Sequence, residues 1–264
     1  MAANSLPVAL ITGAGRGIGA ATAKALSNDG WNVVLVDACA DDAALDYSLC
    51  TNADLEAAAG DCGGVAVVAD VRDASQLSAA ADTAVERFGR LDAAIASAGV
   101  IVGGEALWEI SDARWQALID INVTGVLNLA RAAVPHLLAT AEETSSGRFV
   151  AISSGIALKA SPKLAAYSAS KAAVIGLVRG LAADLANTGV TANIVQPGTT
   201  DTSVLAPSAA VYDLDDPAEF TQHHIDNRVL DPAEVAAAIA WLASAGSSAV
   251  NGAVVPVDAG MTAR

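Results

Sequence analysis

Aromatic side chains and positive charges are scarce in this sequence. Only 4% of its 264 residues are aromatic, so a hydrophobic core has to be built mainly from aliphatic side chains and alanine. Lysine and arginine together number 14 against 29 aspartates and glutamates, which leaves a formal net charge of -15. Phosphate backbones and anionic membrane surfaces repel a chain this acidic, so we expect neither nucleic acid nor a membrane as a partner.

Cysteine is also scarce, and the few cysteines offer no disulfide framework. Cys39, Cys50 and Cys62 contain no Cys-x-x-Cys pair, and any single disulfide leaves one of them over. We interpret them as idle thiols in a reducing compartment. Met1–Ser5 is short and polar rather than a basic leader, and we expect no apolar run long enough to span a bilayer. These absences favour a soluble, cytoplasmic protein.

Hydrophobic residues are abundant, at 53% of the chain, and they gather in short runs separated by longer helical patterns. This composition excludes a disordered chain. Continuous apolar strands alternating with helices are typical of a parallel sheet covered on both faces, so we predict an α/β, Rossmann-type doubly wound sheet flanked by helices. No repeat and no change of composition marks a linker, which favours one domain over residues 1–264.

Strands are expected at Val8–Thr12, Val33–Asp37, Val65–Ala69, Ala93–Ser97, Phe149–Ser153, Val190–Val195 and Ala253–Val257. Helices are expected at Ile18–Asp29, Ser75–Phe88, Asp112–Ala139, Tyr167–Asn187 and Pro232–Leu242, the last with Asp231 as its N-cap. Two stretches fit neither pattern: the acidic segment 38–51, which we interpret as an insertion, and the segment 199–227. Irregular segments this long inside a compact domain are usually binding loops or lids, so we expect the first near a ligand and the second against the substrate.

A glycine-rich turn follows the first expected strand, over Thr12–Gly19. Its glycines allow a tight turn and a close approach of the backbone to a ligand, and the next helix points free N–H groups and its positive dipole end at a pyrophosphate. A strand–helix turn without a ligand has a similar sequence. The place of this turn, before a strand that ends in an acidic residue, favours a dinucleotide site. We expect Gly13, Arg16, Gly17, Ile18 and Gly19 to contact the cofactor.

The acidic residue at the end of the second strand is Asp37. Its carboxylate can accept hydrogen bonds from the adenosine ribose hydroxyls and would repel a 2′-phosphate. The next basic residue along the chain is Arg72, so the pattern favours NAD over NADP. A solvated loop aspartate is the alternative. Asp70 and Val71 follow the third strand, where Asp70 is placed either to contact adenine or to cap a turn.

Four residues form a candidate catalytic set. Tyr167 and Lys171 stand four residues apart and share one helical face. Ser154 follows the fifth strand, at the sheet edge where cofactors and substrates bind, and Asn122 lies on the preceding long helix. Each alone has an ordinary structural explanation: a surface pair, a strand end, a helix residue. Their combination behind a dinucleotide turn predicts an alcohol dehydrogenase or ketone reductase.

The residue types suit the removal of a proton from an alcohol. A free tyrosine has a pKa near ~10, and lowering it by roughly three units needs about 4 kcal/mol. One positive charge at ~4 Å supplies on the order of 4 kcal/mol at an effective dielectric constant of about 20. The Lys171 ammonium and an oxidised nicotinamide can therefore make Tyr167 a base. Ser154 would hold the substrate oxygen, and Asn122 would position a water that connects Lys171 to solvent.

These motifs, in this order, resemble the short-chain dehydrogenase/reductase family along nearly the whole chain. The resemblance implies a seven-stranded Rossmann sheet, NAD(P)(H), and catalytic roles for Ser154, Tyr167, Lys171 and Asn122. It also implies a homotetramer, or a homodimer, formed through the two long helices. One departure is Ala96-Ser97-Ala98-Gly99, where the family often has Asn-Asn-Ala-Gly. Further cofactor contacts that the resemblance implies are Ala98, Gly99, Tyr167, Lys171, Pro197, Gly198, Thr200 and Thr202.

Segment 38–51 and the run Gly99–Glu109 are similar to features of mycofactocin-associated dehydrogenases. That resemblance implies a nicotinamide cofactor that stays bound and passes its electrons to the peptide-derived carrier mycofactocin. Segment 38–51 would then act as a clasp over the adenosine, with Thr51 and Asp54 capping the helix that follows. A surface insertion without a role is the alternative.

The expected substrate contacts are largely apolar. They are Val100–Val102, Ser154–Ala157 and segment 199–227, with Trp108 and Tyr212 as aromatic walls. A neutral, fairly hydrophobic secondary alcohol and its ketone or aldehyde fit such a site. The neighbouring His223 and His224 lack further ligands in the sequence pattern, so we expect no metal.

Three functions remain open from the sequence. The first is NAD-linked alcohol oxidation with tightly held NAD and mycofactocin as the electron acceptor. The second is an ordinary short-chain dehydrogenase with exchangeable NAD(H); a ketoacyl-carrier reductase fits less well because it would use NADPH and a basic docking patch. The third is a catalytically silent NAD-binding sensor or scaffold, against which the complete catalytic set argues.

Overall fold

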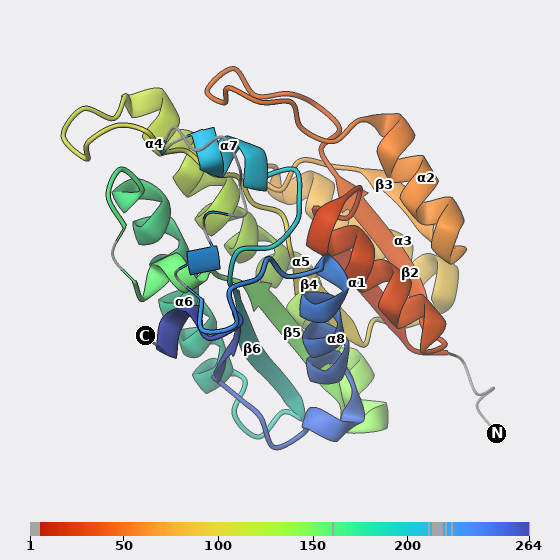
Figure 1. Ribbon diagram of the computed structural model, residues 1–264. Coiled ribbons are helices and arrows are strands. Elements are labelled where there is room, and N and C mark those ends of the chain that lie inside the picture. The colour runs from red at the N-terminus through yellow and green to blue at the C-terminus, as the bar shows by residue number, and fades with distance from the viewer. Residues whose placement is uncertain are drawn as a thin grey trace.

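A single parallel sheet organises the chain (Figure 1). The computed structural model describes residues 6–159, 161–210, 212, 219, 221–222 and 224–263. Its seven strands lie in the order β3-β2-β1-β4-β5-β6-β7, and every neighbouring pair is parallel. The strands are β1 Val8–Thr12, β2 Asn32–Asp37, β3 Val65–Val68, β4 Ala93–Ala96, β5 Gly147–Ile152, β6 Val190–Pro197 and β7 Val254–Val257. The predicted Rossmann-type doubly wound sheet is confirmed, whereas the count of one domain stays a prediction.

Helices cover both faces of the sheet (Figure 1). They are α1 Gly17–Asn28, α2 Asn52–Cys62, α3 Ala74–Phe88, α4 Asp112–Ile119, α5 Gly125–Thr144, α6 Ala165–Asp184, α7 Leu205–Ala210 and α8 Pro232–Ala243. Helices α1, α2 and α8 pack on one face, and α3, α5 and α6 pack on the other. Because the order of strands reverses between β1 and β4, a crevice forms at their carboxyl ends.

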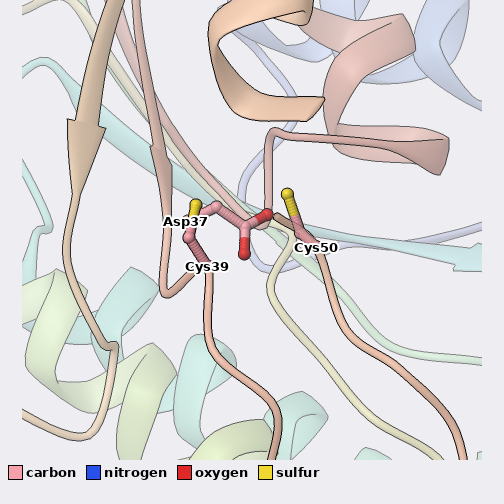
Figure 2. Close-up of side chains that lie close together, drawn as sticks. All are labelled: Asp37, Cys39 and Cys50. Carbon is pink, nitrogen blue, oxygen red and sulfur yellow. The ribbon is translucent and has the colours of Figure 1, made fainter. Parts of the chain in front are cut away.

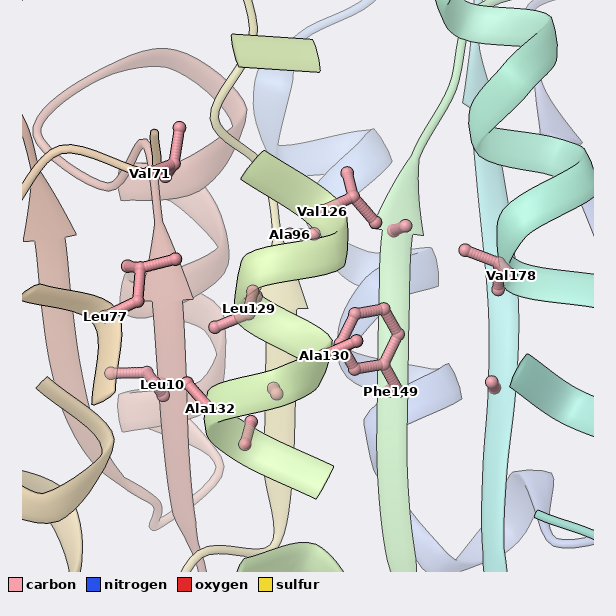
Figure 3. Close-up of a cluster of buried hydrophobic side chains, with 14 of the residues drawn as sticks. Leu10, Val71, Leu77, Ala96, Val126, Leu129, Ala130, Ala132, Phe149 and Val178 are labelled. Carbon is pink, nitrogen blue, oxygen red and sulfur yellow. The ribbon is translucent and has the colours of Figure 1, made fainter. Parts of the chain in front are cut away.

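Each face of the sheet has its own hydrophobic core. Successive side chains of a strand point to opposite faces, so Leu10 of β1 joins the α3–α5–α6 side while Ile11 joins the α1–α2–α8 side. Figure 3 shows the first core, in which Leu129 of α5 and Phe149 of β5 are fully buried. Burial on both faces explains why the central strands are continuously apolar.

Local signals place several helix ends correctly. The predicted cap of α2 is present as a full capping box, in which Thr51 accepts from the Asp54 N–H and the Asp54 carboxylate accepts from the Thr51 N–H. Helix α8 begins in the same way, with Asp231 as its N-cap and Pro232 in its first turn. Both boxes satisfy backbone N–H groups that the helix cannot pair internally.

The long helical segment predicted over Asp112–Ala139 differs in two ways. It extends to Thr144, and a π-helical turn at Asp120–Thr124 separates α4 from α5. The expectation that no segment could span a bilayer is also wrong by length and composition, since Asp112–Thr144 passes both criteria. However, 61% of its most apolar window is buried inside the fold, which is the pattern of a core helix.

Candidate active site

A cavity of about 600 Å³ opens at the carboxyl ends of the strands. Segment 38–51, α4 and α7 gather at this end of the molecule (Figure 1). The predicted catalytic and cofactor-binding residues that line the cavity are Gly13, Arg16, Gly17, Ile18, Gly19, Asp37, Asp70, Val71, Ala98, Gly99, Ser154, Tyr167, Lys171, Pro197, Gly198, Thr200 and Thr202. Of that catalytic and cofactor-binding set, Asn122 alone does not line it.

The turn after β1 can only be built from glycine at two positions. A Cβ on Gly13 would lie 2.6 Å from the Ala98 Cα, and Gly13 has a φ of +64°. A Cβ on Gly19 would lie 2.1 Å from the carbonyl oxygen of Gly13. Helix α1 begins at Gly17, and its N-cap Arg16 makes no side-chain cap bond among the described residues. Free N–H groups and the helix dipole therefore face the cavity, as a pyrophosphate requires.

Acidic groups surround the far end of this turn. Asp37, the last residue of β2, accepts a hydrogen bond from the Gly15 N–H at 3.1 Å. Arg72, the first basic residue after it, is held at 2.6 Å by both Asp42 and Asp70. Because two carboxylates engage this guanidinium, its charge is poorly placed to receive a 2′-phosphate. The arrangement suits NAD, and Asp70 serves an ion pair as well as the cavity wall.

Ser154, Tyr167 and Lys171 meet on one wall of the cavity. Ser154 follows β5, and its hydroxyl is hydrogen-bonded to the Tyr167 phenol from the first turn of α6. The Lys171 ammonium, one turn further, donates to the carbonyl of Ile152 at 3.0 Å. It also lies against Gly99, where a Cβ would come within 2.9 Å of its nitrogen. The catalytic trio is therefore assembled around the ends of β4 and β5.

The pKa of the Tyr167 phenol differs in direction from the sequence expectation. Burial raises it, and the hydrogen bond to Ser154 opposes this only in part. Burial also lowers the pKa of Lys171, to about 8. The predicted lowering of the tyrosine pKa is absent here because desolvation dominates and the ammonium hydrogen-bonds to Ile152. A bound oxidised nicotinamide would bring a further positive charge toward the phenol.

Asn122 lies in the π-helical turn and is fully buried behind the cavity. Its amide oxygen accepts from the Val100 N–H at 2.8 Å, and its amide nitrogen donates to the Val100 carbonyl and the Ser170 hydroxyl. The side chain is thus engaged in tying α6 to the segment after β4. That this side chain positions a water for Lys171 stays a prediction; a Cβ on Gly99 would lie 3.3 Å from the Asn122 amide oxygen and 2.9 Å from the Lys171 nitrogen, so the two side chains approach the same backbone position.

Segment 38–51 forms part of the cavity wall, which sequence reasoning anticipated only in outline. Ala38, Ala40, Tyr47, Leu49 and Cys50 line the cavity. Arg16 of the glycine turn donates to the Ser48 carbonyl at 2.6 Å. Tyr47 reaches the segment after β4 and bonds the backbone of Ile101. No local pattern marks Tyr47, because its partner is 54 residues away.

The substrate end is only partly as predicted. Val100, Ile101 and Tyr212 line the cavity, and the Tyr212 hydroxyl donates to the Pro162 carbonyl at 2.6 Å. Trp108 is not an aromatic wall: its side chain is 86% exposed, on the loop before α4. Lys159 and Met261 also line this end and were not predicted. Residues 211, 213–218, 220 and 223 of the predicted substrate loop, His223 included, lie outside the described residues.

Known proteins match this chain along nearly its whole length. A family model described as enoyl-(acyl carrier protein) reductase matches residues 13–262. The (-)-trans-carveol dehydrogenase of Rhodococcus erythropolis is 37% identical, over 97% of this chain and 98% of that protein. The cis-4-hydroxycyclohexanecarboxylate dehydrogenase of Sinomonas cyclohexanicum is 37% identical, over 97% and 96% of the two chains. The crystal structure of carveol dehydrogenase from Mycobacterium avium in complex with NAD has a TM-score of 0.92 at 34% identity, with 99% of both chains covered.

Proposed function

The chain belongs to the short-chain dehydrogenase/reductase family and is an NAD-dependent oxidoreductase, and from this premise we propose that it interconverts a neutral, fairly hydrophobic secondary alcohol and its ketone or aldehyde. The observation that carries the proposal is the meeting of the Ser154 hydroxyl, the Tyr167 phenol and the Lys171 ammonium in the same cavity as the glycine turn. A catalytically silent NAD sensor would have no need of a hydroxyl pair beside a buried lysine.

The glycine turn, Asp37 and the residues after β4 and β6 would hold NAD. The nicotinamide of NAD, when bound, supplies the hydride acceptor. Tyr167 takes the hydroxyl proton of the alcohol, and Ser154 donates a hydrogen bond to the same oxygen. Lys171 favours the ionised tyrosine through its positive charge. Asn122 is a positioning residue, because its two hydrogen bonds hold the backbone of Val100, which lines the cavity.

The apolar lining supports the proposed substrate class. Val100, Ile101, Leu164 and Met261 line the same cavity as Tyr167. The relatives named above are dehydrogenases of carveol, a hydrophobic secondary alcohol, and of cis-4-hydroxycyclohexanecarboxylate, which carries its hydroxyl group on a ring. We propose a compact hydrophobic secondary alcohol for this chain, on the ground that the exposed lining of the cavity is more apolar than polar.

We further propose that NAD stays bound through turnover and that mycofactocin is the electron acceptor. Support comes from segment 38–51, which lines the cavity and is tied to both of its sides by Arg16 and Tyr47. Segment 38–51 would have to move away from the cavity before NAD could dissociate. Exchangeable NAD is the competing possibility. We also propose a cytoplasmic location and assembly as a homotetramer or homodimer through the long helices.

The central test combines Tyr167→Phe with an alcohol panel. We expect the variant to lose at least ~100-fold in turnover while binding NAD as the parent chain does, because only the proton-transfer group is removed. Tyr212→Phe is the matched control, since it removes a phenol from the same cavity away from Ser154. Normal turnover by Tyr167→Phe would overturn the proposed chemistry.

Cofactor retention is tested separately. Denaturing the freshly purified chain should release about one equivalent of NAD(H) per chain. Turnover should then need an artificial electron acceptor and should not respond to added free NAD. A nucleotide-free chain that turns over freely with added NAD would establish the exchangeable mode instead.

A further inference from the structure

Three potential metal ligands converge at the adenosine end of the cavity, outside the catalytic set. They are Asp37, Cys39 and Cys50, and one donor atom of each lies within 4.8 Å of the others (Figure 2). Two are soft thiols and one is a carboxylate. Asp37 and Cys50 line the cavity, so water and ions can reach them.

The backbone is shaped to bring the two thiols together. Cys39 follows β2 with a φ of 51°, a left-handed conformation that residues with a side chain rarely adopt. Cys50 ends segment 38–51, just before the capped α2. The two sulfur atoms lie within 4.8 Å of each other, and the Cys50 thiol donates to the Thr51 carbonyl. Thus residues eleven positions apart in the chain are held in contact at the two ends of one segment.

The backbone of the glycine turn packs directly against two of the three ligands. A Cβ on Gly15 would lie 2.0 Å from the Cys50 sulfur and 3.3 Å from an Asp37 carboxylate oxygen. Both donor atoms therefore rest directly over the Gly15 backbone. This contact also links the cluster to the turn that would cradle the pyrophosphate.

The three ligands combine one carboxylate with two thiols, a set that suits a thiophilic divalent cation. A bound cation would release the thiol protons through its own charge. In the described residues no basic side chain is hydrogen-bonded or ion-paired to the three ligands.

We propose that Asp37, Cys39 and Cys50 bind a thiophilic divalent cation such as Zn²⁺, and that this ion and the adenosine of NAD exclude each other. Zinc takes sulfur at about 2.3 Å and carboxylate oxygen at about 2.0–2.2 Å, so tetrahedral ligands stand roughly 3.3–3.8 Å apart. The donor atoms, which lie within 4.8 Å of one another, would have to approach by about 1 Å to reach these distances. Water from the cavity supplies a fourth ligand.

The exclusion follows from Asp37. A carboxylate that coordinates the cation has lost the lone pair that would accept from a ribose hydroxyl. This part of the proposal uses the Asp37–ribose contact of the proposed function, whereas metal binding itself does not. The consequence is inhibition: a chain whose three ligands hold the metal ion binds NAD more weakly.

The test uses Co²⁺ as a spectroscopic substitute for Zn²⁺ on the full chain, as purified and after removal of bound nucleotide. We expect one equivalent to bind the nucleotide-free chain with a sulfur-to-cobalt charge-transfer band, and Zn²⁺ to displace it. Cys39→Ser and Cys50→Ser should each weaken binding by about 10–100-fold or more and lose intensity in the band. Cys62→Ser is the matched control, since that thiol bonds the Ala58 carbonyl within α2 and should leave the band intact.

Saturating NAD should weaken metal binding at least ~10-fold, and Asp37→Asn should weaken both ligands. The proposal is overturned if no charge-transfer band forms, if the cysteine variants bind as the parent does, or if NAD and metal bind independently. A chain lighter by the two thiol hydrogens, with no band, would assign a disulfide in its place. None of these measurements uses turnover, so their failure is separate from a failure of the proposed alcohol chemistry.

Discussion

The Tyr47 hydroxyl and the Ile101 backbone hold each other by two hydrogen bonds. The phenol accepts from the Ile101 N–H at 2.9 Å and donates to the Ile101 carbonyl at 3.2 Å. One bonded residue belongs to segment 38–51 and the other to the apolar wall beside Tyr167. This pair therefore connects segment 38–51 to the segment after β4, and we call it the Tyr47–Ile101 bridge. Burial raises the pKa of Tyr47 to about 12, so the phenol stays protonated and able to donate.

Tyr47→Phe should loosen this bridge. The variant leaves two backbone groups of Ile101 without their partner, at a cost of about 1–3 kcal/mol, so we expect NAD to dissociate about 10-fold faster or more. Release of bound NADH into a trap, followed by fluorescence, measures the rate. Tyr212→Phe provides the comparison. Equal dissociation rates in the parent and Tyr47→Phe would show that the bridge does not retain the cofactor.

Asp37 should determine the choice between NAD and NADP. Asp37→Ala removes both the ribose acceptor and the charge that repels a 2′-phosphate, so NAD affinity should fall about 10-fold and the preference over NADP should relax. Dissociation constants for both nucleotides provide the measurement. Asp29→Ala, at the exposed end of α1, is the control for net charge. An unchanged NAD/NADP ratio would remove the ribose contact from the proposal.

The direction of catalysis should respond to pH. Burial raises the pKa of Tyr167 and lowers that of Lys171 to about 8. Alcohol oxidation needs the deprotonated tyrosine, so its rate should rise as pH increases through the tyrosine pKa, while ketone reduction, which needs the protonated form, should fall. Above pH about 8 the lysine charge is progressively lost, which should flatten the rise.

Lys171→Met sharpens this pH test. Without the ammonium the tyrosine pKa should be higher still, so the rise in oxidation should move to higher pH and the rate at pH 7 should drop about 100-fold. Rate profiles for both directions in parent and variant provide the check. A variant profile that coincides with the parent's would contradict the role given to Lys171.

Gln196 should position Ser154. Its buried amide nitrogen donates to the Ser154 carbonyl at 2.9 Å, although Gln196 does not line the cavity. Gln196→Met should therefore lower kcat about 10-fold, the effect of about 1.4 kcal/mol, without changing NAD affinity. Thr191→Val, on the same strand, is the control because its buried hydroxyl has no partner among the described residues. A change in NAD affinity alone would argue for a structural role only.

Sequence reasoning placed most of the sheet and the cofactor turn correctly. Strand β1 agrees with the structure at both ends, and β2 begins one residue before its predicted start. The cap of α2 was predicted from Thr51 and Asp54 alone. These features depend on near neighbours: apolar periodicity, the steric demands of a tight turn, and capping across three residues.

The site was predicted less completely where long-range contacts decide it. Asn122 was placed on a helix, but only the π-helical turn shows that its amide is bonded to Val100. Trp108 was assigned to the substrate wall by hydrophobicity, yet its loop leaves it in solvent. In both cases the sequence shows the type of residue but not the surroundings into which its side chain points.

The amino-acid sequence by itself determined the family, the order of strands and helices along the chain, and the identity of the groups available for chemistry. Only the tertiary structure decided that Tyr47 meets Ile101, that Lys171 bonds Ile152, and that Cys39 and Cys50 meet beside Asp37. The physical reason is range. Backbone preferences act over a few residues, whereas the meeting of distant side chains depends on how loops cross the sheet edge, which no local pattern encodes.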